Sequence, residues 1–401
     1  MNAPARRYFD YAATTPLDPR VWAAMQPYFE AEFGNPSSVH GYGQRAEAAV
    51  EQARGRLAAA LGCQPEELLF TSGGTESNNL ALRGAALDAR RQRGANRLLV
   101  SPVEHPAVAR TADQLAAEFG FELVRLPADE YGMVHPQDVT RLLTADTALV
   151  SVILANNEVG TLNPISEVAA ICRERGVAFH SDAIQAPAHV PLNVTELGID
   201  LLSLGAHKLY GPKGVGLLFV RAGTPLLPIQ TGGSHEAGLR AGTHNVPYIV
   251  GIAVAFELAQ TEIDQSINRL IDWRNTIINS VLNDIDDSKL TGHPTQRLAN
   301  HASFVFKGVD GNALLMLLDD AGFACSSGSA CKTGDPQPSE VLLAMGITPE
   351  WANGSLRITL GKHTTQADVD ALLTALPALI ERARKLESAH QRSSVAKGFS
   401  S

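Results

Sequence analysis

Short apolar runs that alternate with helix-like stretches between about residues 65 and 220 limit the possible folds of this chain more than any other feature. The amphipathic stretches include 75–91 and 165–175, and the apolar runs are LLFTS, RLLVS, TALVSVILA, VAFHSD, DLLSL and VGLLFV. Buried strands that alternate with helices predict an α/β fold in which a mostly parallel sheet is covered on both faces. Ligands of such sheets bind at the strand ends, so we expect the functional site there.

The rhythm of the sequence changes after a glycine-rich interval at 232–242. A helical stretch at about 246–283 is followed by the strand-like SFVFK, the helix-like GNALLMLLDDAG, a polar loop, the strand-like LRITL and a long helix at 366–389. This mixture predicts a second, smaller α+β lobe. The length of 401 residues is sufficient for about two to three domains.

The charge balance and the length of the apolar runs exclude several kinds of partner. The chain carries a formal net charge of -9, which argues against a surface for nucleic acid or for anionic membranes. Its longest apolar runs, such as 148–155, are well short of the roughly 18 residues that a membrane-spanning helix needs. No apolar segment follows Arg6 and Arg7, so the N-terminus is not typical of a secretory signal. We therefore predict a soluble, cytoplasmic protein.

The chain has four cysteines, Cys63, Cys172, Cys325 and Cys331, which are too few and too scattered for a disulfide scaffold. No CxxC pair suggests zinc, and we expect free thiols and no metal site. The first three cysteines occur in or beside apolar patterns that are typical of small core residues. Cys331 differs, because it lies in a polar loop and precedes Lys332, and a neighbouring cation favours the reactive thiolate.

Lys208 lies in the segment LSLGAHKLYGPKGVG, residues 202–216, between two apolar strands. A lysine at the end of a strand is usually a solvated surface residue. If Lys208 is instead enclosed between the strands, the loss of solvation lowers the pKa of its ammonium group and makes a neutral amine available. Lys208 is therefore a candidate nucleophile.

Gly74 and Thr75 follow an apolar run in FTSGGTESNNLAL, residues 70–82. Glycines let the backbone approach a ligand, and the free N–H groups at a helix start favour an anion such as phosphate. An ordinary strand-to-helix turn is the alternative interpretation, because the segment matches neither a P-loop nor a dinucleotide-binding fingerprint.

Other polar residues follow strands of the same expected sheet or lie in the second lobe. Asp182 needs a partner such as a protonated heterocyclic nitrogen, but it could also cap the next turn, and Gln185 follows it closely. Asn157 in ANNEVG could bind a ring substituent or shape a turn, and His105 before a proline could be structural. Arg357 in SLRITLG could clamp a carboxylate or form a surface ion pair.

Taken in order, these segments resemble the cysteine desulfurases of the NifS/IscS type, which are pyridoxal 5'-phosphate (PLP) enzymes of fold type I related to class-V aminotransferases. The resemblance spans nearly the whole chain and rests on YFDYAATTPLDP, FGNPSSVHGYG, TSGGTES, EHPAV, NNEVG, SDAIQ, AHKLYGPKGVG, GGSHEAGLRAGT, SSGSAC and LRITLG. It implies a large PLP-binding domain at 14–260 with a mostly parallel seven-stranded sheet. Residues 1–13 and 261–401 would form a smaller α+β domain that carries the Cys331 loop.

The resemblance also implies a role for each candidate around the cofactor ring. Lys208 would hold the PLP aldehyde as a Schiff base, and Asp182 would keep the pyridine nitrogen protonated so that the ring acts as an electron sink. His105 would stack on the ring and assist proton transfer. Gln185 and Asn157 would hydrogen-bond the phenolic oxygen and its surroundings, and Asn157 would also assist substrate binding.

Further contacts are implied for the phosphate and for the substrate. Gly74, Thr75 and His207 would surround the phosphate, and Arg357 would hold the substrate carboxylate. Thr243, in GLRAGT, would reach across a homodimer interface to the phosphate of the partner.

The activity implied by the resemblance is the conversion of L-cysteine to L-alanine. Cys331 would take the sulfur as a persulfide and pass it to an acceptor or scaffold protein for iron–sulfur cluster or other sulfur-containing cofactor synthesis. The SSGSAC segment resembles the first group of the family, not the RxGxHC pattern of the second, which argues against a dedicated selenocysteine lyase. A selenocysteine lyase, another class-V PLP lyase and a sulfur-carrier subunit that has lost turnover are the alternatives.

Three features depart from the family pattern. Gly205 stands where relatives commonly have a serine or threonine that donates to the phosphate, and a lost hydrogen bond of this kind costs about 1.5–3 kcal/mol unless water or Ser203 compensates. Lys332 stands where relatives often have threonine, and its charge favours the thiolate of Cys331. The tail after residue 389 does not resemble the scaffold-binding tail of the housekeeping iron–sulfur enzymes.

Overall fold

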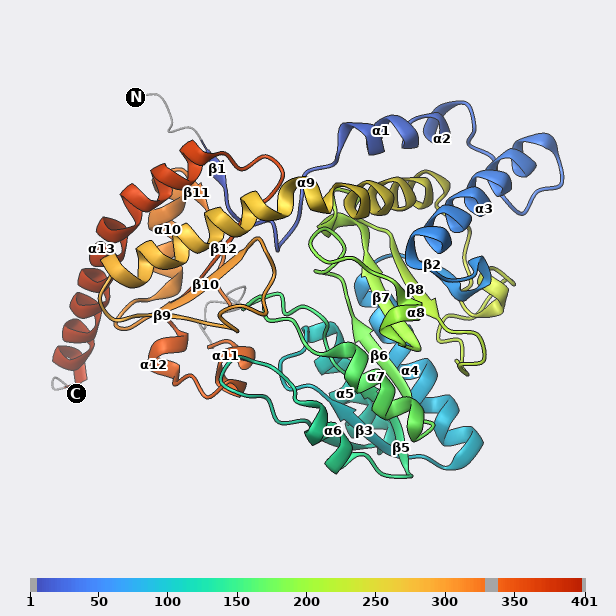
Figure 1. Cartoon of the computed structure of the whole chain (residues 1–401), viewed down its shortest axis with the longest axis horizontal. Helices are drawn as coiled ribbons and strands as arrows, with labels where there is room; N and C mark the ends of the chain where they lie inside the picture. The colour runs from blue at the N-terminus through green and yellow to red at the C-terminus, as the bar shows by residue number, and fades with distance from the viewer. Residues whose placement is uncertain (1–5, 329–337, 399–401) are drawn as a thin grey trace.

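A computed structural model describes residues 6–328 and 338–398 of the chain (Figure 1). The largest sheet in this part has seven strands, which we call the large sheet: β2 (Leu68–Thr71), β3 (Arg97–Val100), β4 (Glu122–Arg125), β5 (Thr147–Ser151), β6 (Ala178–Asp182), β7 (Leu201–Gly205) and β8 (Gly216–Val220). Its order is β2-β8-β7-β6-β5-β3-β4. Only β8 pairs antiparallel, with β2 and β7, and the other pairs are parallel. The predicted α/β fold with a mostly parallel sheet is confirmed.

Helices cover both faces of the large sheet. One face packs against α4 (Gly74–Arg93) and α5 (Pro106–Phe119), and the other against α3 (Gly41–Leu61), α7 (Ile165–Glu174) and the first part of α9 (Val246–Asp284). The shorter helices of the described residues are α1 (Pro19–Met25), α2 (Pro27–Glu30), α6 (Pro136–Leu142), α8 (Val194–Leu197), α11 (Glu340–Ala344) and α12 (Pro349–Ala352).

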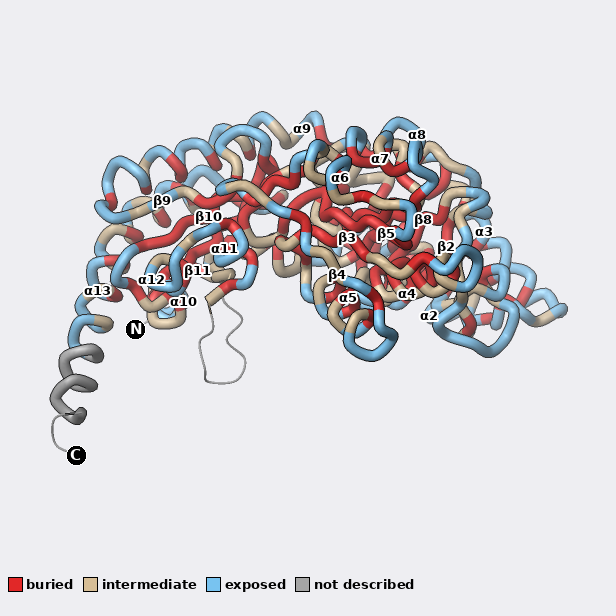
Figure 2. Tube along the Cα trace, turned by 90° about the horizontal axis from the view of Figure 1, so that it is seen from below, coloured by how far each residue is buried: buried red, intermediate tan, exposed pale blue. Residues whose placement is uncertain are grey.

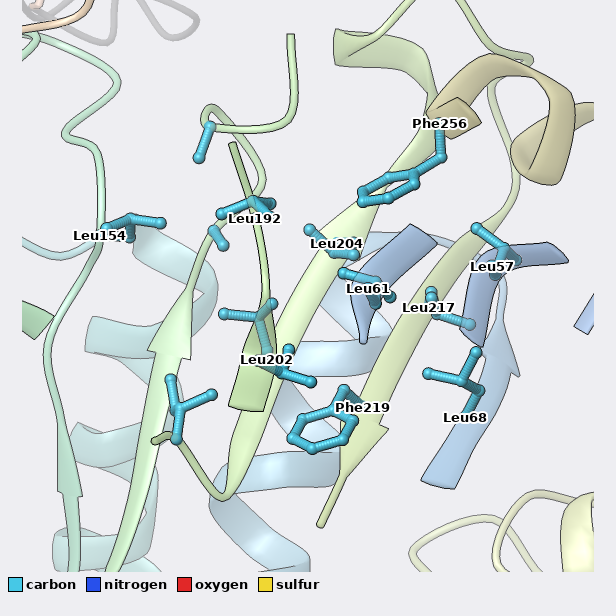
Figure 3. Packing of buried hydrophobic residues seen from close by; sticks show 14 of the residues in the cluster. Leu57, Leu61, Leu68, Leu154, Leu192, Leu202, Leu204, Leu217, Phe219 and Phe256 are labelled. Carbon is cyan, nitrogen blue, oxygen red and sulfur yellow. The ribbon is translucent and has the colours of Figure 1, made fainter. Parts of the chain in front are cut away.

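Alternate side chains of the strands fill the two cores. In β8, Leu217 and Phe219 belong to the core under α3, whereas Leu218 and Val220 belong to the core under α4. Figure 3 shows Leu217 and Phe219 beside residues of β2 and β7 on the first of these faces. Because both faces are buried, most residues of these strands are apolar, and the buried polar ones, such as His180 and Ser203, pair with each other. The strands were therefore recognisable as apolar runs.

A second core lies beside the large sheet. Its sheet, which we call the small sheet, has the order β12-β10-β9 and is antiparallel, with strands β9 (Ser288–Leu290), β10 (His301–Phe306) and β12 (Ser355–Thr359). It packs with α10 (Gly311–Asp320), α13 (Gln366–Gly398) and the last part of α9. Figure 2 shows buried segments in both lobes, and a short parallel pair of β1 (Arg7–Tyr8) and β11 (Phe323–Ala324) adjoins the second.

Helix α9 belongs to both cores. Ile252 and Phe256 pack in the core of the large sheet, and Leu270 and Ile277 pack in the core of the small sheet. The helix is long and apolar enough to cross a membrane by length and composition, but burial inside the protein accounts for this apolar character. The domain bounds, 14–260 for the large domain and 1–13 with 261–401 for the small one, stay a prediction. The division between residues 260 and 261 would fall within α9.

The edge strand β4 was not expected from the sequence. Its residues, Glu122–Arg125, are exposed or only partly buried, so they form no continuous apolar run. The strand is recognisable only through its parallel pairing with β3, which places Leu123 opposite Leu98.

A buried ionic cluster fixes the segment 232–244 against the large sheet. Nη2 and Nη1 of Arg54 donate hydrogen bonds to the carboxylate of Glu236, at 2.8 and 3.1 Å. Glu236 also accepts hydrogen bonds from the backbone N–H of Phe70 at 2.8 Å and from His244 Nε2 at 2.5 Å. The backbone of Glu236 has a φ of 51°, in the left-handed region that non-glycine residues rarely adopt. These four contacts hold a strained turn in place.

The stability contributed by Glu236 should depend on pH. Burial alone would raise the pKa of this carboxyl, but hydrogen bonds from His244 and Arg54 lower it to about 2. A carboxyl with a lowered pKa stabilises the fold fully above its ordinary value of 4.5 and progressively less as the pH falls toward 2. Glu236→Gln should therefore lower the melting temperature at neutral pH and flatten its dependence on pH in the acid range, as measured by calorimetry.

Glu51→Gln is the matched control for this prediction. Glu51 pairs with the same Arg54 at 3.2 Å, but its side chain is 58% exposed. Such exposed pairs contribute only about 0–1 kcal/mol, so this variant should melt almost as the wild type does. Parallel curves of melting temperature against pH for the Glu236→Gln variant and the wild type would contradict the prediction.

Candidate active site

The carboxyl ends of the parallel strands bring most of the predicted site residues together. Thr75 follows β2, His105 follows β3, Asn157 follows β5, Asp182 ends β6 and Lys208 follows β7. A cavity of about 240 Å³ is lined by these residues together with Ala12, Ala13, Gly74, Ile153, Ile184, Gln185, His207 and Arg357. Because the strands run the same way, residues more than a hundred positions apart share one edge of the sheet.

Lys208 is held against the N-terminal segment and not in solvent. Its Nζ donates hydrogen bonds to the carbonyl oxygens of Ala12 at 2.5 Å and of Ala13 at 2.7 Å. Burial, and secondarily the positive charge of Arg357, lowers the pKa of Lys208 to about 8, although two nearby aspartates act in the opposite direction. A substantial fraction of this amine is therefore neutral near physiological pH and can act as a nucleophile.

Asp182 both caps a turn and faces the cavity. Its Oδ1 accepts a hydrogen bond from the backbone N–H of Ile184 at 3.0 Å, and its Oδ2 accepts one from Asn78 Nδ2 at 2.7 Å. Burial raises the pKa of the Asp182 carboxyl. A cationic ligand atom placed against it would favour the charged form, so this carboxyl can recognise a protonated nitrogen.

His105 is the N-cap of α5, and it also lines the cavity. Its Nδ1 accepts a hydrogen bond from the backbone N–H of Ala107 at 3.0 Å, which places the hydrogen of the neutral ring on Nε2. Burial lowers the pKa of His105. The neutral imidazole can therefore stack on an aromatic ligand, and the structural and functional interpretations of this residue are compatible.

Asn157 is not the residue that shapes its turn. Asn156 does so, because its Oδ1 accepts hydrogen bonds from the backbone N–H groups of Glu158 at 2.8 Å and Val159 at 2.9 Å. The Oδ1 of Asn157 is buried and has no partner among residues 6–328 and 338–398. An unpaired buried oxygen is costly, so the Asn157 side chain is free to bind a ligand in the cavity.

Arg357 projects from β12 of the small sheet into the cavity of the large one. Its residue is 7% exposed, so the alternative of a surface ion pair is wrong. Nη2 donates to Asp10 Oδ1 at 2.9 Å and Nη1 donates to the carbonyl oxygen of Asn157 at 2.9 Å. Nε is buried and has no partner in the part of the chain that the structure describes, which leaves a donor for an anionic ligand.

Three further lining residues have the character of an anion site. Gly74 is the first residue of α4, where the helix N–H groups have no intrahelical partner, and a Cβ at this position would overlap the side chain of Ile184. Thr75 follows it. His207 contacts Thr14 Oγ1 through Nδ1 at 3.2 Å, and burial lowers the pKa of His207 to about 4, so its imidazole is neutral.

Ser203 cannot replace the hydroxyl that Gly205 lacks. Its Oγ is fully buried and pairs with His180 Nε2 at 3.0 Å, away from the cavity. At Gly205, a Cβ would lie 3.5 Å from the backbone nitrogen of Gly74, which is an ordinary contact. Residue 205 therefore has room for a larger side chain. With Ser203 excluded, a water molecule is the remaining candidate for the missing hydrogen-bond donor.

The other predicted residues occupy different environments. Gln185 lines the cavity and its Nε2 donates to the carbonyl oxygen of Ala12 at 2.9 Å. Thr243 is exposed and does not line the cavity. Cys331 and Lys332 lie outside the described residues.

Within the described residues, no group of three His, Cys, Asp or Glu side chains could hold a metal ion. Cys63, Cys172 and Cys325 are free thiols.

Sequence reasoning missed two residues that support the site. Asn78 stands in the segment FTSGGTESNNLAL and holds Asp182, and Asp10 stands in YFDYAATTPLDP and holds Arg357. Both segments belong to the motifs that carry the family resemblance. Their contacts join residues 104 and 347 positions apart, and local spacing in the sequence does not indicate such contacts.

Comparison with known proteins gives one family for nearly the whole chain. Residues 7–372 match the sequence model of the family described as aminotransferase class-V. A solved structure titled NifS-like protein superposes with a TM-score of 0.87 at 35% sequence identity, covering 94% of this chain and 99% of that one.

Curated relatives are similar over almost their full length. Cysteine desulfurase IscS of Dictyoglomus turgidum is 46% identical over 379 residues, which cover 94% of this chain and 95% of the relative. Cysteine desulfurase IscS of Methanosarcina thermophila is 44% identical over 379 residues, which cover 94% and 93% of the two chains.

Lys208 should react with aldehydes at a lower pH than an ordinary lysine. After hydroxylamine has removed any bound aldehyde, a small aromatic aldehyde and cyanoborohydride should label the Lys208 peptide half-maximally near pH 8, because the pKa of this amine is lowered to about 8. Peptide mass spectrometry measures the labelling. Lys208→Arg is the control that removes the labelled amine, and a midpoint near the ordinary value of 10.5 would show that the amine is not desolvated.

Proposed function

Because the chain belongs to the class-V aminotransferase family and is a PLP-dependent cysteine desulfurase, we propose that Lys208, His105 and Cys331 are its catalytic residues. One observation carries this assignment. One cavity is lined by a desolvated lysine, a buried carboxylate, a neutral histidine and a guanidinium with an unpaired N–H. The chain is similar to a cysteine desulfurase over nearly its full length.

The residues of the cavity fit PLP. Asp182 supplies a carboxylate for the ring nitrogen, and Asn78 and Ile184 orient that carboxylate. His105 offers the face of a neutral ring for stacking. The Oδ1 of Asn157 has no hydrogen-bond partner among the described residues, and a bound ligand would supply one. The amide side chains of Asn157 and Gln185 can hydrogen-bond the polar substituents of the ring.

The phosphate of the cofactor would fit beside Gly74, Thr75 and His207, which all line the cavity. A helix start favours a dianion through its free N–H groups and its dipole. The neutral His207 can donate one hydrogen bond but adds no charge. With Gly205 in place of a hydroxyl donor, we expect weaker phosphate binding than in relatives that have the donor.

When bound, PLP supplies an acceptor for the electron pair released at the substrate Cα. Lys208 would hold the cofactor through its Nζ, and the same amine, when it is not bound to the cofactor, would accept the Cα proton. His105, with its hydrogen on Nε2, stacks on the ring and assists the proton movement. The lowered pKa of Lys208 suits both tasks, because they need a neutral amine.

Arg357 and Asn157 bind the substrate carboxylate. The Nε of Arg357 is the unused donor of a guanidinium whose other nitrogens are held by Asp10 and by the carbonyl oxygen of Asn157. A planar guanidinium that is fixed in this way binds a carboxylate in one orientation. The bound carboxylate would then lie in the cavity that Lys208 also lines.

Cys331 is the sulfur acceptor. Its thiolate attacks the sulfur of the bound cysteine, so an S–S bond forms as the Cβ–S bond breaks. The electron pair of the broken bond stays with the carbon skeleton, which takes up protons and leaves as alanine. The persulfide on Cys331 then passes to an acceptor protein, and we propose iron–sulfur cluster or other sulfur-containing cofactor synthesis as the use of this sulfur.

We place the protein in the cytoplasm, without a membrane or nucleic-acid partner. The activity requires reduced thiols, which the cytoplasm maintains, and the net charge of -9 disfavours nucleic acid. Cell fractionation followed by immunoblotting tests the location, and recovery of the protein in the membrane fraction would contradict it.

A homodimer is proposed as the active form. Thr243 is exposed and lies outside the cavity, so it can reach a phosphate only in a second subunit. The exposed apolar side chains of the N-terminal helical region, Phe29, Phe33, Val39 and Tyr42, provide a surface that a second copy would cover.

The desulfurase assignment is tested with purified protein, PLP and L-cysteine. We expect alanine and a persulfide on Cys331, measured by amino-acid analysis and mass spectrometry, and a cofactor that borohydride fixes to the peptide around residue 208. Lys208→Ala should lose the covalent cofactor and more than about a hundredfold in turnover. Cys331→Ser should keep the cofactor colour and form no persulfide.

Two further comparisons complete this test. Arg357→Lys should raise the KM for cysteine by about tenfold with a smaller change in kcat, because it removes bidentate binding. Selenocysteine should be consumed as well as cysteine. Consumption of selenocysteine alone, or persulfide transfer that survives in Cys331→Ser, would refute the corresponding assignment.

The dimer is tested at low PLP concentration by complementation between two protomers with different defects. Thr243→Ala should weaken PLP binding, and a mixture of Thr243→Ala and Lys208→Ala chains should regain activity, because one site of each heterodimer then contains both native residues. Analytical ultracentrifugation should show dimers throughout. A monomeric active species, or a mixture no more active than its components, would exclude a shared site.

A further inference from the structure

Glu158 lies outside the cavity, one residue after Asn157, and contacts the chain on the far side of residues 329–337. Its Oε2 accepts a short hydrogen bond from Ser339 Oγ. Ser339 is only 4% exposed and is also the N-cap of α11, because its Oγ accepts a hydrogen bond from the backbone N–H of Leu342 at 3.2 Å. The contact thus joins the turn beside the cavity to the beginning of a helix.

The same carboxylate oxygen also lies against Gly328, on the near side of residues 329–337. A Cβ at Gly328 would be 2.6 Å from Glu158 Oε2 and 3.3 Å from Ser339 Cβ. Only a residue without a side chain lets the two flanking segments and the carboxyl approach this closely. Glu158 therefore touches both segments that flank 329–337.

Glu158 is itself fixed relative to the cavity. Its backbone N–H donates to Asn156 Oδ1 at 2.8 Å, in the turn that also presents Asn157 to the cavity. The near flanking segment has a second anchor, because Ser326 Oγ donates to Asp10 Oδ2 at 2.8 Å and Asp10 pairs with Arg357. The far segment is also packed in a buried apolar cluster, in which Val341 and Leu342 join Val103 and Ile153. Glu158 adds the polar contact that fixes its first part, at Ser339, beside the turn at the cavity.

Burial and the surrounding charges bring the pKa of the Glu158 carboxyl close to neutral pH. Burial raises its pKa to about 7, the Ser339 hydrogen bond and the positive charge of Arg357 act in the opposite direction, and Glu340 raises it further. In either protonation state the carboxyl retains an oxygen that accepts the Ser339 hydroxyl hydrogen.

We propose that Glu158 is a positioning residue that holds the segments on both sides of residues 329–337 at a fixed place beside the cavity, and so sets how often the Cys331 thiol meets the substrate sulfur. The role in sulfur transfer rests on the proposed function of Cys331. The contacts with Gly328 and Ser339 do not depend on it.

Hydrogen–deuterium exchange of the holoenzyme without substrate tests the positioning itself. Glu158→Ala should increase exchange in the peptides that contain residues 324–328 and 338–344, whereas Glu158→Gln should resemble the wild type, because its amide oxygen can accept the Ser339 hydrogen. Glu381→Gln is the control for the loss of a carboxylate. Glu381 is exposed and pairs with Arg384 in α13, away from both peptides, so its loss should change neither of them.

Kinetics of the same proteins test the consequence for catalysis. Glu158→Ala should lower kcat for alanine formation by about tenfold, with the KM for cysteine and the cofactor spectrum unchanged, because a misplaced group reduces productive encounters without altering binding. Glu158→Gln should stay within about threefold of the wild type. A general structural defect would instead change the spectrum, the KM and the melting temperature together.

Gly328→Ala provides an independent variant if Glu158→Ala fails to fold. Its methyl group would displace the Glu158 carboxyl without removing it, and it should give the same increase in exchange and the same fall in kcat. Wild-type exchange and kcat in both variants would overturn the proposal. A wild-type enzyme that fails to desulfurate cysteine would refute the proposed function, while the exchange data would still decide whether Glu158 fixes the two segments.

Discussion

The common direction of the strands is the constraint on which the site depends. Parallel pairing from β7 through β6, β5 and β3 places the ends of these strands at one edge, and β2 points the same way because antiparallel β8 separates it from β7. His105, Asn157, Asp182 and Lys208 meet there although each comes from a different strand. A shift of one residue in any of these strands would turn its terminal side chain to the other face of the sheet. The burial of both faces prevents such a shift.

Arg357 joins the two cores at this edge. It comes from the small sheet, contacts Asp10 of the N-terminal segment and reaches the carbonyl oxygen of Asn157 beside the large sheet. The cavity is therefore complete only when both sheets are correctly placed. The positive charge of the same guanidinium is the second cause, after burial, of the lowered pKa of Lys208. The proposed carboxylate-binding group and the proposed nucleophile are thus electrostatically linked.

The strands of the large sheet could be predicted from the sequence where burial on both faces produces an apolar run. Strand β4 could not be predicted, because its residues are exposed or only partly buried and form no such run. For the site, the position of candidates at strand ends could be predicted from the alternation of elements. Asn156 and Asn157 could not be distinguished, because only tertiary contacts show which of them shapes the turn. Ser203 could not be assigned either, since its pairing with His180 depends on the register between β6 and β7.

Helix α9 has a consequence for how this protein can change over evolutionary time. One continuous helix supplies side chains to both cores, with Phe256 in the first and Leu270 in the second, and no loop separates these stretches. Recombination between related genes near this point would join half-helices whose apolar faces had been selected against different neighbours. An exchange of one whole lobe would therefore disturb the packing of α9 in both cores, whereas a substitution in a surface loop would leave this packing intact.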